Sequence, residues 1–285
     1  MLVELRELGF ERVELGHGIR ISLMEGVLRA VERGVVQISS LHNYCPLPVE
    51  IMGASPDCYV YSSPDPRERE RAVRQTLQTI DFAARFGAKF VVLHLGRVPI
   101  DDYTSKLVKM AEVGMHLSRG YVSLKLESVK KRQAQAEGFL ARAKECLTRV
   151  AAHAAARGVT LGIESRHSYE EIPTEREMLA IMDEFKVPHV GYWHDFGHVH
   201  VKHNLGYLDH LEWMTAIAPR LVGCHLHDTQ WPGRDHQPPF TGDVPYDELL
   251  ALLPKETLFV FEMSPRKTRE EIIEAREKWA AKFGP

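Results

Sequence analysis

The stretch HVGYWHDFGH (residues 189–198) begins as an apolar and aromatic run and ends in a carboxylate, a glycine and a histidine. Other short runs have the same design, with few polar interruptions and no strict alternation. They are ERVELGHG (11–18), VVQISSLHNY (35–44), KFVVLHLG (89–96), VTLGIES (159–165), RLVGCHLHD (220–228) and TLFVFEMS (257–264). Runs of this kind are typical of parallel strands that are buried on both faces. The sequence therefore predicts seven parallel strands.

Segments with helical periodicity separate these runs, and several of them end at a glycine, as helices commonly do. The expected helices span residues 22–34, 65–86, 130–157, 174–185, 208–218, 246–253 and 268–283. A repeated strand–helix unit with right-handed crossovers predicts a parallel sheet, which can be open or closed into a barrel. Two stretches that follow strand ends, 46–66 and 97–128, are expected to be insertions, where active-site lids usually lie.

Polar side chains end strand after strand, and this pattern distinguishes the two kinds of sheet. These residues are His42, His94, Glu164, Asp195, His225 and Glu262. An open sheet gathers ligands at one switch point, whereas a closed barrel directs all its strand ends to one mouth. We therefore predict an α/β fold, a (β/α)8 TIM-type barrel forming a single domain over residues 1–285. It apparently lacks the first strand, because the chain begins inside a helical segment, LVELRELGFE (2–11).

Composition narrows the class of protein. There are 36 basic and 39 acidic side chains, and a net charge of −3 gives no electrostatic reason to expect a nucleic-acid partner. The four cysteines form no CxxC pair, which favours a reducing, cytoplasmic location. Since no apolar run is long enough to span a bilayer, we expect no membrane partner. Assembly into a homo-oligomer is left open.

Three carboxylates at strand ends, Glu164, Asp195 and Glu262, indicate a cation site. Each follows an apolar run and is therefore partly shielded from water, where carboxylates repel one another unless a cation compensates. Together with His225 they would form a mixed nitrogen and oxygen site, which suits Mn2+, Zn2+, Co2+ or Fe2+. The alternative is that these residues line the rim of the barrel and pair with lysine or arginine.

The remaining strand-end histidines, with one arginine, are candidates for substrate binding. His42, His94, His198 and His236 would surround the site, contacting substrate hydroxyls or holding a second cation. Arg234 lies with His236 in the loop 231–249 and suits an anionic or hydroxylated substrate; a solvated surface turn is the alternative for this loop. The sequence contains no P-loop, no GxGxxG after a strand and no GxSxG elbow that would favour another chemistry.

Five motifs in order resemble those of the xylose isomerase-like TIM barrel superfamily, in its sugar phosphate isomerase/epimerase branch, over nearly the whole chain. They are GIES (162–165), DFGH (195–198), CHLHD (224–228), FTGDVPYDELL (240–250) and FVFEMS (259–264). The resemblance implies a divalent metal ion held by Glu164, Asp195, His225 and Glu262, with Mn2+ expected and Zn2+, Co2+ or Mg2+ as alternatives. It also implies that Glu164 and Glu262 are the catalytic acid/base pair. His225 matches the ligand better than His227, because the family pattern reads His-x-x-Asp.

The activity implied by this resemblance is that of a metal-dependent isomerase or epimerase of a small sugar, polyol or sugar phosphate. Proton transfer would pass through a metal-stabilised enediolate. One alternative is a dehydratase of a cyclic polyol or ketoacid on the same metal site. Another is an apurinic-endonuclease-like phosphodiesterase, whose additional metal ligands His42, His94, His198 and His236 resemble. Its expected aspartate, two residues before His236, is Arg234 here. A barrel that binds but does not catalyse is the alternative from another class.

Overall fold

The structure is a computed structural model that describes residues 1–186 and 188–284. The chain divides into two compact units, each assembled from separate stretches of sequence. Unit 1 comprises Met1–Gly96, Phe139–Glu164 and Ile181–Gly191, and unit 2 comprises Arg97–Gly138, Ser165–Ala180 and Tyr192–Pro285. The strands follow the order β1-β2-β3-β4-β5-β6-β9 in one seven-stranded sheet, and β7 and β8 form a separate pair. The predicted number of strands is therefore confirmed.

Unit 1 holds the first four strands, which pair in parallel with their neighbours. These are β1 (Arg12–Leu15), β2 (Gln37–His42), β3 (Phe90–Leu93) and β4 (Thr160–Glu164). Its helical elements are α1 (Leu2–Glu7), η1 (Ile21–Leu23), α2 (Met24–Glu32) and α3 (Pro66–Phe86). In the described chain α1 is the first element, so the sheet begins at β1 as the sequence predicted.

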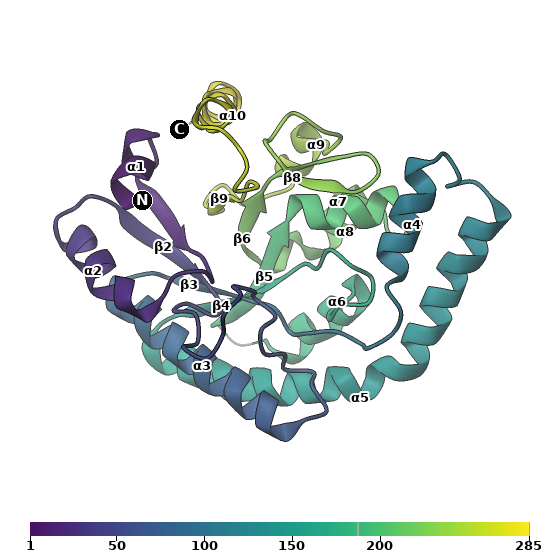
Figure 1. Cartoon of the computed structure of the whole chain (residues 1–285), viewed down its shortest axis with the longest axis horizontal. Coiled ribbons are helices and arrows are strands. Elements are labelled where there is room, and N and C mark those ends of the chain that lie inside the picture. The colour runs from purple at the N-terminus through teal and green to yellow at the C-terminus, as the bar shows by residue number, and fades with distance from the viewer. Residues whose placement is uncertain (187, 285) are drawn as a thin grey trace. The chain divides into compact units, whose positions relative to one another are not determined.

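Helix α3 shows how the sequence fixes the frame of unit 1. It begins where the Asp65 side chain accepts a hydrogen bond from the Arg67 backbone N–H, and it ends where Gly87 adopts a left-handed φ of 72°. Between these ends, Val73, Ile80 and other small or apolar residues at helical spacing are buried. This face packs on β2 and β3 (Figure 1), which holds the ends of those strands in place.

Unit 2 holds the strands that carry the other polar ends. These are β5 (Val190–Asp195, whose first two residues belong to unit 1), β6 (Leu221–Leu226) and β9 (Phe259–Phe261). They pair in parallel, and the register sets Asp195 opposite His225 and Leu226 opposite Phe261. An antiparallel hairpin of β7 (Asp228–Gln230) and β8 (Arg234–Gln237) follows β6.

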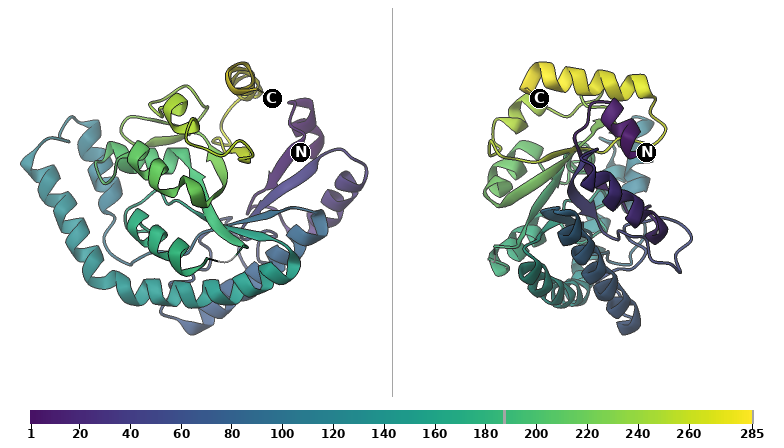
Figure 2. Two further views of the ribbon diagram at one scale, coloured as in Figure 1. Left: turned by 180° about the vertical axis from the view of Figure 1, so that it is seen from behind. Right: turned by 90° about the vertical axis from the view of Figure 1, so that its left-hand side faces the viewer.

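Most helices of the chain lie in unit 2. They are α4 (Tyr103–Glu112), α6 (Glu175–Glu184), α7 (Phe196–Asn204), α8 (His210–Ile217), η2 (Ala218–Arg220), α9 (Tyr246–Leu250) and α10 (Arg269–Phe283). The last residues of α6 belong to unit 1. Helix α5 (Arg119–Arg157) begins in unit 2 and ends in unit 1, and Figure 2 shows it as one uninterrupted helix. Within the part that the structure describes, no helix combines the length and apolar character needed to cross a membrane.

Two expectations about loops differ from the structure. The stretch 97–128, expected as an insertion, contains α4 and the start of α5, and only 46–65 is irregular, since Pro66 already begins α3. Asp102 caps α4 by accepting a hydrogen bond from the Ser105 N–H. Leu107 and Tyr121 pack against Leu205, and all three residues belong to unit 2. Helix α7 was also missed, because it starts directly at the end of β5 with Asp195 as its N-cap.

Candidate functional site

Three of the predicted residues meet in unit 1, at the ends of β2, β3 and β4. Glu164 Oε2 lies 2.7 Å from His94 Nε2 and 3.1 Å from His42 Nε2, and all three side chains are buried. The opposite ring atoms are also engaged: His94 Nδ1 is 3.2 Å from Asp57 Oδ1, and His42 Nδ1 is 3.1 Å from the Asn43 carbonyl oxygen. Unit 1 therefore gathers a buried carboxylate and two imidazoles from three neighbouring strands.

The hydrogen-bond partners of these imidazoles indicate how they are protonated. A carbonyl or carboxylate oxygen only accepts, so Nδ1 of both His42 and His94 carries the proton. In a neutral ring Nε2 then turns a lone pair toward the carboxylate of Glu164. A nitrogen lone pair and a carboxylate attract each other only if a proton or a cation lies between them. A nitrogen and oxygen donor set whose second ring atoms are held in this way fits a divalent metal ion.

Three further predicted residues meet in unit 2. His225 Nδ1 lies 3.0 Å from Glu262 Oε2 and 3.8 Å from Asp195 Oδ2. Asp195 and His225 are fully buried, whereas Glu262 is partly exposed. The parallel register of β5, β6 and β9 is what aligns these three side chains. Two carboxylates and one imidazole again form a donor set suited to a divalent transition metal.

Asp195 is fixed by its position at the junction of β5 and α7. Its Oδ1 accepts a hydrogen bond of 2.7 Å from the His198 backbone N–H, as an N-cap does. Its own backbone N–H donates to Ser165 Oγ at 2.8 Å. Since Ser165 directly follows Glu164 in the chain, the hydroxyl that holds Asp195 is one residue away from the carboxylate that ends β4.

A group of three histidines adjoins Asp195 in unit 2. One nitrogen each from His198, His227 and His236 lie within 4.8 Å of one another. Asp235 Oδ2 is 3.1 Å from His236 Nδ1. Burial by itself would lower the pKa of His236, but the hydrogen bond and charge of Asp235 outweigh it and raise the pKa to about 9. The same pair holds the pKa of Asp235 well below its usual value, against the effect of burial.

The sequence predicted part of this group and missed part of it. His198 and His236 are in place, whereas Arg234 is exposed on β8 and its role stays a prediction. His227 ranked below His225, and Asp235 was not singled out. Two features of the sequence could have pointed to His227 and Asp235. His227 lies two residues after His225, and so on the same face of an extended chain, and Asp235 directly precedes His236.

The other face of β5 carries a separate, buried histidine chain. His194 Nδ1 lies 2.7 Å from Tyr192 Oη and its Nε2 lies 3.1 Å from His210 Nε2. His210 Nδ1 in turn lies 3.3 Å from His200 Nδ1. Burial lowers the pKa of His194 to about 3 and that of His200 to about 4, so this chain is neutral and structural.

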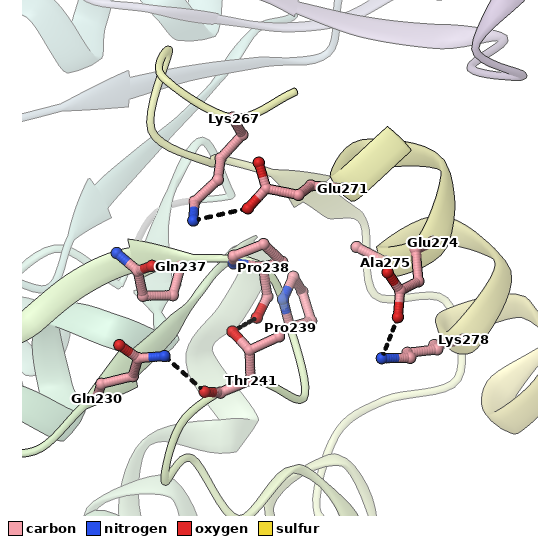
Figure 3. Close-up of a pocket in the computed structure, with 10 residues that line it drawn as sticks. All are labelled: Gln230, Gln237, Pro238, Pro239, Thr241, Lys267, Glu271, Glu274, Ala275 and Lys278. Carbon is pink, nitrogen blue, oxygen red and sulfur yellow. Dashed lines mark hydrogen bonds and ion pairs between the residues drawn. The ribbon is translucent and has the colours of Figure 1, made fainter. Parts of the chain in front are cut away.

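A recess of about 230 Å3 lies elsewhere in unit 2. Figure 3 shows it between the loop at Pro238–Thr241 and α10, beside the ion pairs Lys267–Glu271 and Lys278–Glu274. In the described chain no predicted site residue lines it. The convergence of buried donors, rather than this recess, therefore defines the candidate site.

Comparison with solved structures reveals the same fold in several sugar epimerases. A D-tagatose 3-epimerase-like protein is 17% identical with a TM-score of 0.69, over 98% of this chain and 94% of its own. A 3-keto-D-glucoside 4-epimerase from E. coli is 13% identical with a TM-score of 0.68, over 98% and 92%. A D-psicose 3-epimerase crystallised in the presence of D-fructose is 14% identical with a TM-score of 0.68, over 100% and 93%. At such identities the likeness shows the fold alone.

Comparison by sequence gives the family. Curated proteins yielded no match. The family described as "Xylose isomerase-like TIM barrel", in contrast, matches residues 2–282. That match covers nearly all of the sequence and includes every strand described above, in agreement with the resemblance inferred from the strand-end motifs. The chain therefore belongs to the xylose isomerase-like TIM barrel family.

Proposed function

We propose that the protein is a metal-dependent isomerase or epimerase of a small sugar, polyol or sugar phosphate. The observation that carries the proposal is the approach of His225 Nδ1 to two carboxylates, Glu262 and Asp195, at the ends of parallel strands. Carboxylates gathered at strand ends in a barrel family are candidates for catalysis rather than for stability. The epimerase names of the structural neighbours support the choice of reaction class.

Glu164, Asp195, His225 and Glu262 would hold the metal ion. A bound divalent cation supplies Lewis-acid stabilisation of the negative charge that develops on a carbonyl oxygen. The donors are carboxylate oxygens and imidazole nitrogens, for which Mn2+ is the expected ion and Zn2+, Co2+ and Mg2+ are alternatives. Because Asp195 and His225 are buried, an ion there would relieve the repulsion between the carboxylates.

Glu164 and Glu262 would carry the proton. A hydrogen on the carbon next to a carbonyl is too weakly acidic to leave unaided at neutral pH, so a positioned carboxylate must take it. One glutamate removes the proton, leaving an enediolate, and the other returns a proton. Return to the same carbon from the opposite face gives the epimer. Return to the neighbouring carbon, together with transfer of the hydroxyl proton to the former carbonyl oxygen, gives the isomer.

His198 and His236 would bind the substrate. The pKa of His236 is raised to about 9, so this ring carries a positive charge at neutral pH and can donate to a hydroxyl or a phosphate oxygen. The substrate-binding roles proposed for His42, His94 and Arg234 rest on the sequence. A cytoplasmic location, a single domain and the choice of partners also stay predictions from the sequence.

A phosphodiesterase with additional metal ions is the second candidate. It is favoured by the lone pairs that His42 and His94 would turn toward Glu164, because these rings could serve as ligands of another ion. The number of bound ions separates the two candidates. Three zinc ions per chain would favour the phosphodiesterase, and one Mn2+ would favour the isomerase.

The test is solvent deuterium uptake by ketoses and ketose phosphates, followed by NMR with protein purified without chelators and analysed for metals. The proposal expects uptake at a single carbon next to the carbonyl, in at least one substrate of the panel. Loss of the signal in Glu164→Gln and Glu262→Gln would support the two roles. A metal-loaded, folded protein that exchanges no carbon-bound hydrogen in any sugar would overturn the proposal.

A further inference from the structure

His227, immediately after β6, uses both of its ring nitrogens within unit 2. The backbone N–H of His236 donates to His227 Nδ1 at 2.9 Å. A backbone N–H can only donate, so Nδ1 must accept, and the proton of the neutral ring is on Nε2. That Nε2 lies 2.9 Å from Asp195 Oδ1 and 3.0 Å from Oδ2. His227 therefore donates to a carboxylate on one side and accepts from a loop on the other.

The ring of His227 is also fixed by its neighbours. Gly197, the glycine of DFGH, leaves room for it: a Cβ there would lie 2.0 Å from Cε1 and 2.2 Å from Nδ1 of His227. The ring of His236 stacks on it at 4.1 Å with an interplanar angle of 8°. Any side chain at position 197 would push the ring away from both of its hydrogen-bond partners.

The loop that His227 holds has an unfavourable backbone. His236 has a φ of 53°, a left-handed conformation that residues with a Cβ rarely adopt and that surrounding contacts must maintain. Those contacts are its N–H bond to His227 and the bond of 3.0 Å from the Ser264 N–H to its carbonyl. The hairpin is also closed at its base, where the buried Asp228 carboxylate accepts from the Thr241 and Val244 N–H groups.

We propose that His227 is a positioning residue that couples the metal-binding carboxylate of Asp195 to the loop carrying His236. The inference rests on the proposed function for the role of Asp195 as a ligand. A donor to the carboxylate sets which of its lone pairs remain for a cation, and residues in this role typically tune metal affinity. Movement of the loop thereby changes the orientation of Asp195, and binding of the ion restrains the loop.

A different role for His227 would be that of a ligand, since His198, His227 and His236 each bring one nitrogen within 4.8 Å of the others. The hydrogen bonds favour positioning over ligation. Nδ1 accepts from a backbone N–H and Nε2 faces Asp195, so coordination by His227 would break one of two bonds in a buried place. The experiment below separates the two roles.

Two substitutions at position 227 separate the hydrogen bond that Nδ1 accepts from the hydrogen bond that Nε2 donates. An asparagine amide can place an oxygen near the position of Nδ1 and so keep the acceptor for the His236 N–H. A glutamine amide can place its NH2 group near the position of Nε2 and so keep the donor to Asp195. Two readouts that need no activity are Mn2+ affinity, from EPR of free Mn2+, and hydrogen exchange of the peptide spanning 234–241 without metal.

The expected pattern is reciprocal. His227→Asn lowers Mn2+ affinity by roughly 10–100-fold and leaves loop exchange near that of the wild type. His227→Gln keeps Mn2+ affinity and speeds loop exchange by roughly tenfold, the effect of one lost backbone hydrogen bond. Gly197→Ala, which displaces the ring, shows both effects. His153→Gln, a half-exposed histidine paired with Asp81 in unit 1, is the matched control and shows neither.

Equal effects of Asn and Gln on both readouts, or no effect of either, would overturn the proposal. Loss of one bound Mn2+ equivalent with an unchanged affinity for the rest would overturn it in favour of ligation. If the wild type binds no Mn2+, the metal part of the proposed function fails, and loop exchange alone decides whether His227 restrains the loop. If one variant at 227 fails to fold by circular dichroism, the other and Gly197→Ala decide.

Discussion

His225 Nδ1 lies 3.0 Å from Glu262 Oε2, although 36 residues lie between these two residues in the sequence. The contact exists because β6 and β9 pair in parallel with His225 opposite Val260, so that Glu262 directly follows the paired region. The Glu262 backbone N–H also donates to the Leu226 carbonyl at 3.1 Å. The register between β6 and β9 therefore determines the position of the Glu262 carboxylate beside His225.

The first prediction concerns Glu262 as a proton carrier. Glu262→Gln keeps the size of the side chain but removes its basicity, so deuterium uptake by the substrate is expected to fall by at least about 10²-fold. Solvent exchange followed by NMR measures this loss. Glu274→Gln, on the exposed side of α10 where Glu274 pairs with Lys278, is the matched control and should exchange at the rate of the wild type. Near-wild-type uptake by the Glu262 variant would exclude it as the proton carrier.

The strands and their polar ends could be predicted from the sequence because strands buried on both faces read as continuous apolar runs. This is why Asp195, His225 and Glu262 could be singled out from the sequence as candidates. Helix α7 was missed because Asp195 both ends β5 and caps α7, leaving no turn residues to mark a boundary. The hydrogen bonds of His227 depend on the β7–β8 hairpin and on the left-handed backbone of His236. Neither feature produces a periodic pattern in the sequence, so the role of His227 could not be predicted from it.

A second prediction concerns the packing of α10 in unit 2. The ring of Trp279 contacts Phe259 and Phe261 of β9 and also Phe240 and Tyr246, with centroids 5.2–6.1 Å apart. Trp279→Ala should therefore lower the free energy of unfolding by roughly 3–5 kcal/mol. Urea denaturation followed by circular dichroism measures the change. Trp279→Phe, which keeps an aromatic ring there, should cost less; equal losses would show that aromatic packing at this position is unimportant.

A third prediction concerns the buried histidines behind the site. Burial lowers the pKa of His200 to about 4 and moves the pKa of His210 well below its usual value, with nearby histidines adding to both. In the unfolded chain the pKa of a histidine is about 6.5, so between about pH 4 and pH 6.5 the unfolded chain binds more protons than the folded protein. Stability is then present above about pH 6.5 and falls as the pH drops toward about 4.

At pH 5 the loss should be of the order of 1–2 kcal/mol for each buried histidine. Urea denaturation at pH 7.5, 6.0 and 5.0 measures the slope. His200→Gln removes one titrating group and should flatten the slope over this window, whereas the control His153→Gln, a half-exposed histidine, should keep it. A free energy of unfolding that stays constant from pH 7.5 to 5 would contradict the burial of neutral histidines.

The last prediction concerns removal of the metal ion. Without a cation, the buried carboxylate of Asp195 and its neighbour Glu262 near His225 repel each other. Dialysis against a chelator should lower the melting temperature, and Mn2+ should restore it, because an ion at 100 times its Kd stabilises the folded state by about 2.7 kcal/mol. Differential scanning calorimetry with and without Mn2+ measures the shift. Asp195→Asn keeps the shape of the side chain but weakens the ligand, so its melting temperature should respond far less. An equal rise in the wild type and in this variant would place the ion elsewhere on the protein.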